Sequence, residues 1–178
     1  MKKLLWSPPK NRINNSNLKK FIEFVKLENC NDFKTLWKWS ISNPEKFWSK
    51  FWDFSEIIGE KGNQILKMDN IFYKSKFFFD SKLNYSENIL KKKSDTIAIN
   101  FLSEKGFEEQ ITWNDLYDKV CKLSCYFKKI DLKKGDRVAA YVPNKIETII
   151  SFLACAKNGI IWSSCSPDFG TLGLIERF

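Results

Sequence analysis

Apolar side chains in residues 1–94 recur mostly at helical spacing and include many aromatic rings, with little of the alternation that is typical of strands. The first helical pattern has apolar positions spaced i, i+3, i+4 and i+7, namely Leu18, Phe21, Ile22 and Val25. Ser16 stands just before it, where a serine can accept a hydrogen bond from a free backbone N–H of the first turn. The pattern therefore predicts a helix over 17–29 with Ser16 as its N-cap.

The dipeptide Asn43-Pro44 predicts a second helix start. Asparagine can cap free N–H groups, and proline fits the first helical position because no donor is needed there. The positions that follow form an aromatic stripe, namely Phe47, Trp48, Phe51 and Trp52. Such a stripe is far more often core packing than a cofactor site, so we expect it to pack a helical, aromatic-rich cap region.

Asn84 with Glu87 three residues later resembles a capping box and predicts a short helix over 84–91. The stretch 57–80 shows no clear periodicity, and we expect an irregular connection with one short strand. From Thr96 onward the pattern changes to strands that alternate with helices. We therefore expect the chain to divide into two parts, residues 1–94 and 95–178.

The second part begins with two short apolar runs, 96–102 and 110–113, on either side of a Lys-Gly turn signal, and these predict a hairpin. Thr112 and Asp115 predict the cap of the next helix. Further on, an apolar run over 137–142 and another over 160–164 flank an amphipathic helix. A strand, a helix and a strand joined by short turns predict a parallel pair, so the fold class is α/β.

The net charge of +9 comes mainly from lysine, because Arg12, Arg137 and Arg177 are the only arginines. The lysines are dispersed, whereas a nucleic-acid or membrane-binding face would cluster them and use arginine to grip phosphates. A solvated, Lys-rich surface is therefore favoured, with no nucleic-acid and no membrane partner. A non-enzymatic basic binding module stays open as an alternative.

The chain has no histidine, which excludes a histidine base, nucleophile relay or metal ligand within it. Neither GxGxxG nor GxxxxGK[ST] is present, so these phosphate-binding loops are absent. The five cysteines are odd in number and form no CxxC pair, which indicates neither a metal site nor a disulfide framework. Free thiols and apolar runs too short for a signal peptide or membrane span predict a soluble, cytoplasmic protein.

The residues with potential chemistry gather after the last strand, where α/β proteins place ligand-binding groups. They are Ser166, Pro167, Asp168, Phe169 and Gly170. Asp168 could pair with Arg177, although a turn aspartate and a surface ion pair are the plainer interpretation. Cys165 lies at the mouth of this candidate site, but without a histidine to activate it a nucleophilic role is a poor hypothesis. No catalytic residue is assigned within the chain.

Several segments together resemble the adenylate-forming acyl-CoA synthetases of the AMP-binding superfamily, and more closely their acetoacetate-CoA ligase (acetoacetyl-CoA synthetase) branch. The matching stretches are 5–8, 36–40, 47–54, 83–90, 135–144 and 161–170. The run GDRVAAYVPN over 135–144 is similar to the superfamily at large, whereas WSSCSPDFG over 162–170 is similar to the acetoacetate branch. Ser86 stands where that branch has alanine.

The resemblance implies an N-terminal cap region over 1–94 and the start of the AMP-binding domain over 95–178. It implies a ligase that converts ATP, acetoacetate and CoA, with Mg2+ accompanying ATP, through an acyl-adenylate. The family's phosphate loop and adenylation lysine would lie beyond Phe178, so we expect an N-terminal fragment that is inactive alone. The loop 166–170 becomes a candidate contact on the CoA side. A ligase for another short-chain acid stays open as an alternative.

Overall fold

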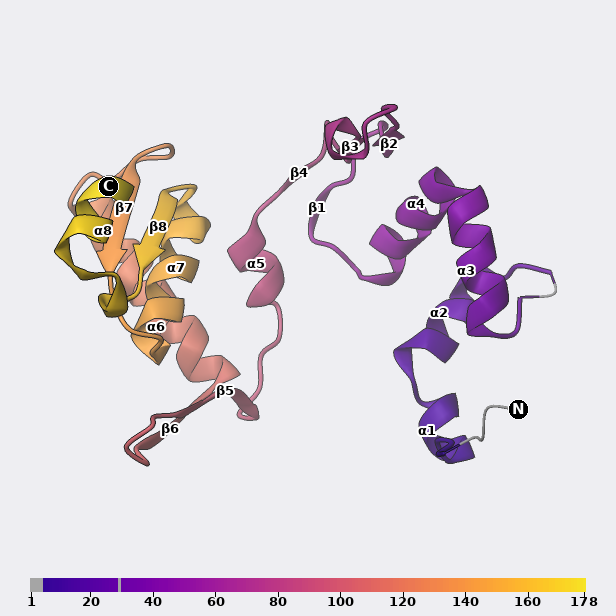
Figure 1. Cartoon of the computed structure of the whole chain (residues 1–178), viewed down its shortest axis with the longest axis horizontal. Helices are drawn as coiled ribbons and strands as arrows, with labels where there is room; N and C mark the ends of the chain where they lie inside the picture. The colour runs from indigo at the N-terminus through magenta and orange to yellow at the C-terminus, as the bar shows by residue number, and fades with distance from the viewer. Residues whose placement is uncertain (1–4, 29) are drawn as a thin grey trace. The chain divides into compact units, whose positions relative to one another are not determined.

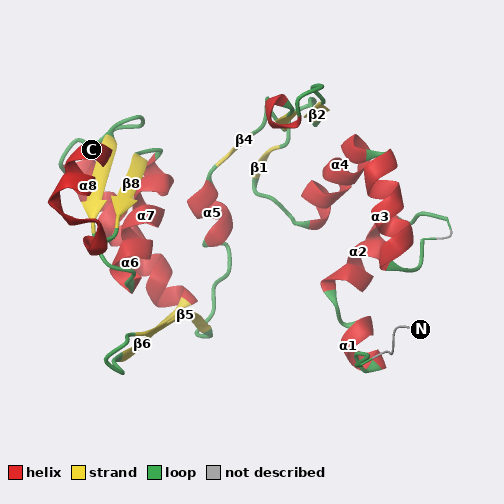
Figure 2. Cartoon of the chain, viewed as in Figure 1, coloured by secondary structure: helices red, strands yellow, loops and turns green. Residues whose placement is uncertain are grey.

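The computed structural model describes residues 5–28 and 30–178 (Figure 1). The chain forms two compact units, Met1–Leu83 and Asn84–Phe178. The first is largely helical, and the second combines helices with strands (Figure 2). The predicted α/β class is confirmed for the chain, with its parallel strand pair in the second unit.

The first unit contains α1 (Lys10–Asn14), α2 (Asn17–Val25), α3 (Phe33–Ser42) and α4 (Pro44–Phe54). Its buried core is small and apolar, and it consists of Phe21, Ile22, Val25, Cys30 and Leu36. The ring of Phe21 meets three rings of α4 edge-on, with centroids 5.0 to 5.9 Å apart. The aromatic rings of α4 therefore pack on α2, although none of that helix is fully buried.

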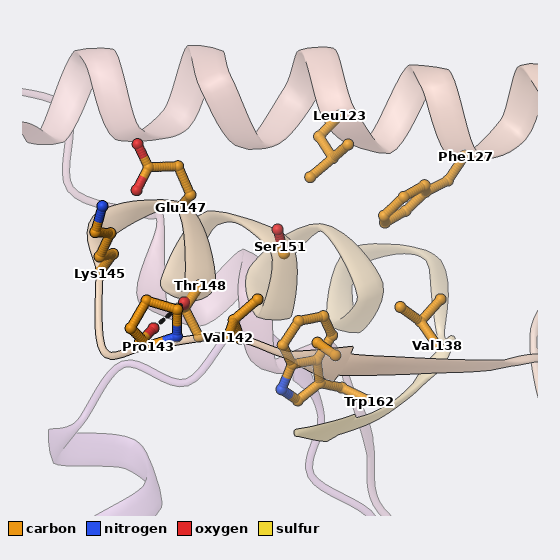
Figure 3. A pocket seen from close by; sticks show the side chains of 11 residues that line it. Leu123, Phe127, Val138, Val142, Pro143, Lys145, Glu147, Thr148, Ser151 and Trp162 are labelled. Carbon is orange, nitrogen blue, oxygen red and sulfur yellow. Dashed lines mark hydrogen bonds between the residues drawn. The ribbon is translucent and has the colours of Figure 1, made fainter. Parts of the chain in front are cut away.

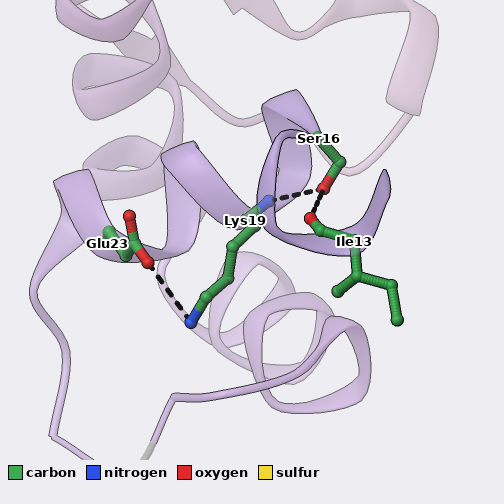
Figure 4. A network of polar contacts seen from close by, with 4 residues as sticks. All are labelled: Ile13, Ser16, Lys19 and Glu23. Atoms are coloured by element: carbon green, nitrogen blue, oxygen red, sulfur yellow. Dashed lines mark hydrogen bonds and ion pairs between the residues drawn. The ribbon is translucent and has the colours of Figure 1, made fainter. Parts of the chain in front are cut away.

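Ser16 caps α2 as predicted (Figure 4). Its hydroxyl accepts a hydrogen bond from the backbone N–H of Lys19 at 3.2 Å and donates one to the carbonyl of Ile13 at 2.7 Å. The helix ends at Val25 and not at residue 29, because Lys26 adopts a left-handed conformation with φ 53° that turns the chain away. The predicted range was therefore four residues too long.

Pro44 opens α4 as predicted, but Asn43 does not cap it with its side chain. The Asn43 amide instead donates to the carbonyl of Trp39 at 3.4 Å, in the last turn of α3. Sequence analysis missed α3 altogether, although Asp32 and Thr35 form a reciprocal capping box at its start. The hydrogen bond from the Thr35 hydroxyl holds the pKa of Asp32 below its ordinary value.

The stretch 57–80 has more structure than the single strand expected. Two short antiparallel pairs form, β1 (Gly59–Glu60) with β4 (Lys82–Leu83) and β2 (Leu66–Lys67) with β3 (Lys76–Phe77), around the 3-10 turn η1 (Phe72–Lys74). Asp80 ties the turn before β2, because its carboxylate accepts from the backbone N–H groups of Asn63 at 2.9 Å and Gln64 at 3.1 Å. Side-chain periodicity does not reveal such backbone-to-carboxylate bonds.

The second unit begins with α5 (Tyr85–Ile89), followed by the antiparallel hairpin of β5 (Ile97–Leu102) and β6 (Glu108–Thr112). Thr112 caps α6 (Trp113–Lys129), as predicted, by accepting from the backbone N–H of Asp115. Then come β7 (Arg137–Tyr141), α7 (Ile146–Asn158), β8 (Ile161–Cys165), the 3-10 turn η2 (Pro167–Phe169) and α8 (Gly170–Arg177). The order of elements from β5 to β8 is the predicted one.

β7 and β8 are parallel and in register from Arg137 opposite Ile161 to Tyr141 opposite Cys165, as predicted. The helices α6 and α7 lie beside them in Figure 1 and share their buried core. Gly159 ends α7 in a left-handed conformation with φ 69°, which glycine adopts without steric cost.

The helix α5 belongs to the second unit because Asn84 ties it to the end of α7. The Asn84 amide donates to the carbonyls of Ala156 at 3.0 Å and Lys157 at 3.2 Å, while its oxygen caps α5. The two compact units consequently divide between Leu83 and Asn84. The boundary at 94/95 between a cap region and an AMP-binding domain stays a prediction, since compactness alone does not delimit a family's domain.

Candidate functional site

The loop that carries the candidate residues follows directly on β8. The strand runs through Cys165, one residue further than predicted, and the chain then forms η2 and α8 where sequence analysis expected only a loop. Ser166 starts this turn, and Pro167 occupies its first position, where a missing N–H leaves no donor unsatisfied. The predicted group 166–170 is thus one turn and the start of a helix at the carboxyl end of the parallel pair.

Hydrogen bonds within the turn fix its two polar side chains. The Ser166 hydroxyl donates to the Asp168 carboxylate at 2.7 Å and accepts from the Asp168 backbone N–H at 3.4 Å. The Tyr141 hydroxyl, at the end of β7, donates to the Pro167 carbonyl at 2.6 Å. The turn is therefore held by its own side chains and by the neighbouring strand.

The outer side of the turn is open. Phe169 is 54% exposed, and the Arg177 guanidinium lies 5.1 Å from the centre of its ring. Gly170 has φ 65°, and a side chain added there would meet no atom within 4 Å, so backbone conformation rather than crowding favours glycine. A flat ring beside an arginine and an open glycine backbone form a surface against which an extended polar ligand can lie.

Two interpretations of single residues are corrected by the structure. Asp168 bonds to Ser166 and Arg177 lies on Phe169, so the considered pairing of Asp168 with Arg177 is not the arrangement found. Cys165 does not lie at the mouth of the site, because it is only 5% exposed. As the last residue of β8 it lies opposite Tyr141, and its buried position rules out a thiol presented to a ligand.

A hollow of about 470 Å³ lies between α6, α7 and the sheet, and sequence analysis did not find it (Figure 3). Its apolar lining includes Leu123, Phe127, Val138, Val142 and Trp162. Its polar lining comes from the start of α7 and the residue before it, namely Lys145, Glu147, Thr148 and Ser151. The Thr148 hydroxyl is engaged locally, because it donates to the Pro143 carbonyl at 2.7 Å. No sequence signal marks this hollow, since its walls come from three elements that are distant along the chain.

Chemically, these two places are suited to binding and not to bond breaking. The turn offers one carboxylate, one hydroxyl and an exposed ring, and the hollow offers an apolar floor with a mixed-charge rim. The part of the chain that the structure describes contains no group of three or more cysteine, aspartate or glutamate side chains placed to hold a metal ion. No helix of residues 5–28 and 30–178 is long and apolar enough to span a bilayer.

Comparison with known proteins identifies the class. The profile of the AMP-binding enzyme family matches residues 86–174, which include the hairpin, the parallel pair and the turn 166–170. The match covers half of the chain and begins in α5. The chain therefore belongs to the AMP-binding enzyme family.

Within that family the chain is similar to acetoacetyl-CoA synthetases. It is 35% identical over 177 residues to the acetoacetyl-coenzyme A synthetase of Rhizobium meliloti (strain 1021), covering 98% of this chain and 27% of that protein. It is 36% identical over 192 residues to the acetoacetyl-CoA synthetase of Xenopus tropicalis, covering 99% and 27%. The chain thus spans about a quarter of the length of these relatives, and the resemblance stated from the sequence is confirmed.

The fold agrees with this assignment. The acetoacetyl-CoA synthetase from Streptomyces lividans superimposes with a TM-score of 0.78 at 24% sequence identity, over 95% of this chain and 27% of that one. The likeness establishes the fold of the chain as part of an adenylate-forming enzyme. The fold expectation drawn from the sequence is confirmed at this level.

Proposed function

We propose that this chain supplies the N-terminal part of an acetoacetate-CoA ligase. The complete enzyme would convert ATP, acetoacetate and CoA into acetoacetyl-CoA, AMP and diphosphate through an acyl-adenylate. The observation that carries the proposal is similarity at 35% identity to an acetoacetyl-CoA synthetase over almost the whole chain, including the run WSSCSPDFG. The compartment we propose is the cytoplasm, because all five cysteines are free.

The 178 residues alone are proposed to be inactive. The chain has neither a histidine nor a glycine-rich phosphate loop, and its two candidate surfaces bind rather than react. Mg2+ would enter with ATP, because the described residues provide no cluster of ligands for it. This part of the enzyme would contribute core packing and one wall of a binding site.

The turn 166–170 is proposed to contact CoA. It lies at the carboxyl end of a parallel pair, where ligands of α/β proteins bind, and its outer side is exposed. Phe169 and Arg177 would meet the CoA arm, while Ser166 and Asp168 hold the turn in shape. No residue of the turn is assigned a catalytic role.

A chimera tests the proposal. This chain replaces the matching 177 residues of the Rhizobium meliloti enzyme, and AMP formation is measured with ATP, CoA and either acetoacetate or acetate. We expect acetoacetate-dependent activity from the chimera and none from the isolated chain. Turnover by the isolated chain, or a folded chimera that prefers acetate, would contradict the proposal.

A further inference from the structure

Two lysines and a tyrosine surround the thiol of Cys121. Lys93, between α5 and β5, places its ammonium group over the ring of Tyr117. Lys157, in the last turn of α7, has its Nζ 5.7 Å from the centre of the same ring. Tyr117 and Cys121 are one turn apart on α6, and a hydrogen bond joins their side chains. Side chains from three separate segments thus form one cluster, which we call the Cys121 cluster.

The Cys121 cluster is electropositive. Burial lowers the pKa of Lys93, and the charge of Lys157 lowers it further, against the attraction of Cys121 and Asp118. The hydrogen bond with Cys121 is the main cause that raises the pKa of Tyr117. Neither lysine makes an ion pair within the part of the chain that the structure describes. Two ammonium groups brought together without a bonded carboxylate favour an anionic partner.

Access separates Cys121 from most other thiols of the chain. Cys30, Cys155 and Cys165 are buried, whereas Cys121 is half-buried and Cys125 is exposed. Cys125 lies one turn beyond Cys121 on α6, on the side away from Tyr117 and the two ammonium groups over its ring. Reactive thiols are found in electropositive, partly exposed surroundings, and Cys121 has both features.

We propose that Cys121 is a site of S-thiolation by small anionic disulfides, which the ammonium groups of Lys93 and Lys157 recruit. The Cys121 thiolate attacks one sulfur of the disulfide. A new S–S bond forms to the protein while the original S–S bond breaks, and the other half leaves as a thiolate that takes up the proton lost by Cys121. The disulfide is the oxidant, so no further reagent is needed. The carboxylates or phosphates of the reagent pair with the two lysines.

The first test compares three disulfides on the full 178-residue chain. Oxidised glutathione carries carboxylates, CoA disulfide carries phosphates and cystamine carries amines. Peptide mass spectrometry follows the modification of Cys121 and uses Cys125 as the internal reference. We expect Cys121 to react faster than Cys125 with an anionic disulfide and to lose this advantage with cystamine. An advantage with only one of the two anionic reagents identifies the source, and an equal or larger advantage with cystamine overturns the proposal.

The second test removes one charge at a time. Lys93→Met and Lys157→Met should each slow modification of Cys121 by oxidised glutathione about two- to fivefold, the effect of losing one partly exposed charge pair, and leave Cys125 unchanged. Lys92→Met is the matched control, because the Lys92 ammonium lies 5.4 Å from the ring centre of Trp113 and not on Tyr117. If both cluster variants react with oxidised glutathione and with CoA disulfide at the rates of the unmodified chain, the proposal fails.

Discussion

Tyr141 at the end of β7 donates a hydrogen bond of 2.6 Å to the carbonyl of Pro167, in the turn that follows β8. The bond joins two segments that are 26 residues apart in sequence. It adds to the backbone bond from the N–H of Val142 to the carbonyl of Cys165 at 3.2 Å, which extends the parallel ladder by one step. Together they fix the start of the candidate CoA-binding turn relative to the sheet.

Replacement of Tyr141 by phenylalanine should therefore loosen the turn at small cost to the fold. We expect Tyr141→Phe to lower the free energy of unfolding by about 0.5–1.5 kcal/mol, the net contribution of one hydrogen bond. Urea denaturation measures the change. Tyr126→Phe is the control, since Tyr126 is a comparably exposed tyrosine of α6 for which the described part of the chain offers no hydrogen bond. Equal effects of the two substitutions would contradict the role given to Tyr141.

Ser86 should be replaceable by alanine with a gain in stability. Its side chain is fully buried in α5, and its hydroxyl has no hydrogen-bond partner among the described residues. A buried hydroxyl without a partner costs free energy, so we expect Ser86→Ala to raise the free energy of unfolding by about 1–2 kcal/mol. The change is measured by urea denaturation.

Ser124→Ala is the matched control for Ser86→Ala. Ser124 is also buried, but its hydroxyl donates to Asn158 at 3.1 Å and so links α6 to α7. Its removal should lower stability by about 1 kcal/mol. A loss of stability in Ser86→Ala would show that its hydroxyl is bonded after all.

Local signals in the sequence predicted the elements that they define. Ser16, Thr112 and Gly159 each mark a helix end where the structure has one, because caps and left-handed residues act within one turn of chain. The parallel pair followed from two apolar strands flanking an amphipathic helix. The family resemblance reached the same region through the run that ends at Gly170.

Features that depend on distant contacts could not be read in advance. The chain leaves α2 at Lys26 through a left-handed turn that no side-chain pattern marks. The hollow beside α7 has walls from three elements, and Cys165 is buried only because of how β8 packs. At the turn 166–170 the sequence named the right residues, but which of Ser166, Asp168 and Arg177 bond to each other depends on the path of the backbone.

Asp80 should make the stability of the first unit sensitive to acid. Its carboxylate accepts from the backbone N–H groups of Asn63 and Gln64, and the bond from Asn63 is the main cause that holds the pKa of Asp80 below 3.8. Because the pKa is lower in the folded state, the contribution is present above the unfolded pKa of about 3.9 and is lost as the pH falls through the folded value.

The measurement is urea denaturation between pH 6 and pH 2.5. Asp80→Asn should be less stable than the unmodified chain at pH 6, and the difference should shrink below pH 4. Glu104→Gln removes one exposed negative charge from the turn between β5 and β6, and it controls for net charge. A constant difference for Asp80→Asn across the whole range would exclude the carboxylate as its cause.

Phe169 should affect the thioester-forming step of the proposed enzyme and not its adenylate-forming step. Its ring is half exposed beside Arg177 on the outer side of the turn, where the CoA arm is proposed to lie. In the chimera with the Rhizobium meliloti enzyme, Phe169→Ala should raise the KM for CoA about three- to tenfold, because a ring stacked on a ligand contributes roughly 1 kcal/mol. Acetoacetate-dependent exchange of pyrophosphate into ATP needs no CoA and should stay unchanged. Leu172→Ala, which removes a more exposed apolar side chain one turn further along α8, should change neither. A loss of pyrophosphate exchange in Phe169→Ala would assign the ring to the adenylate site, and an unchanged KM for CoA would remove the turn from the CoA path.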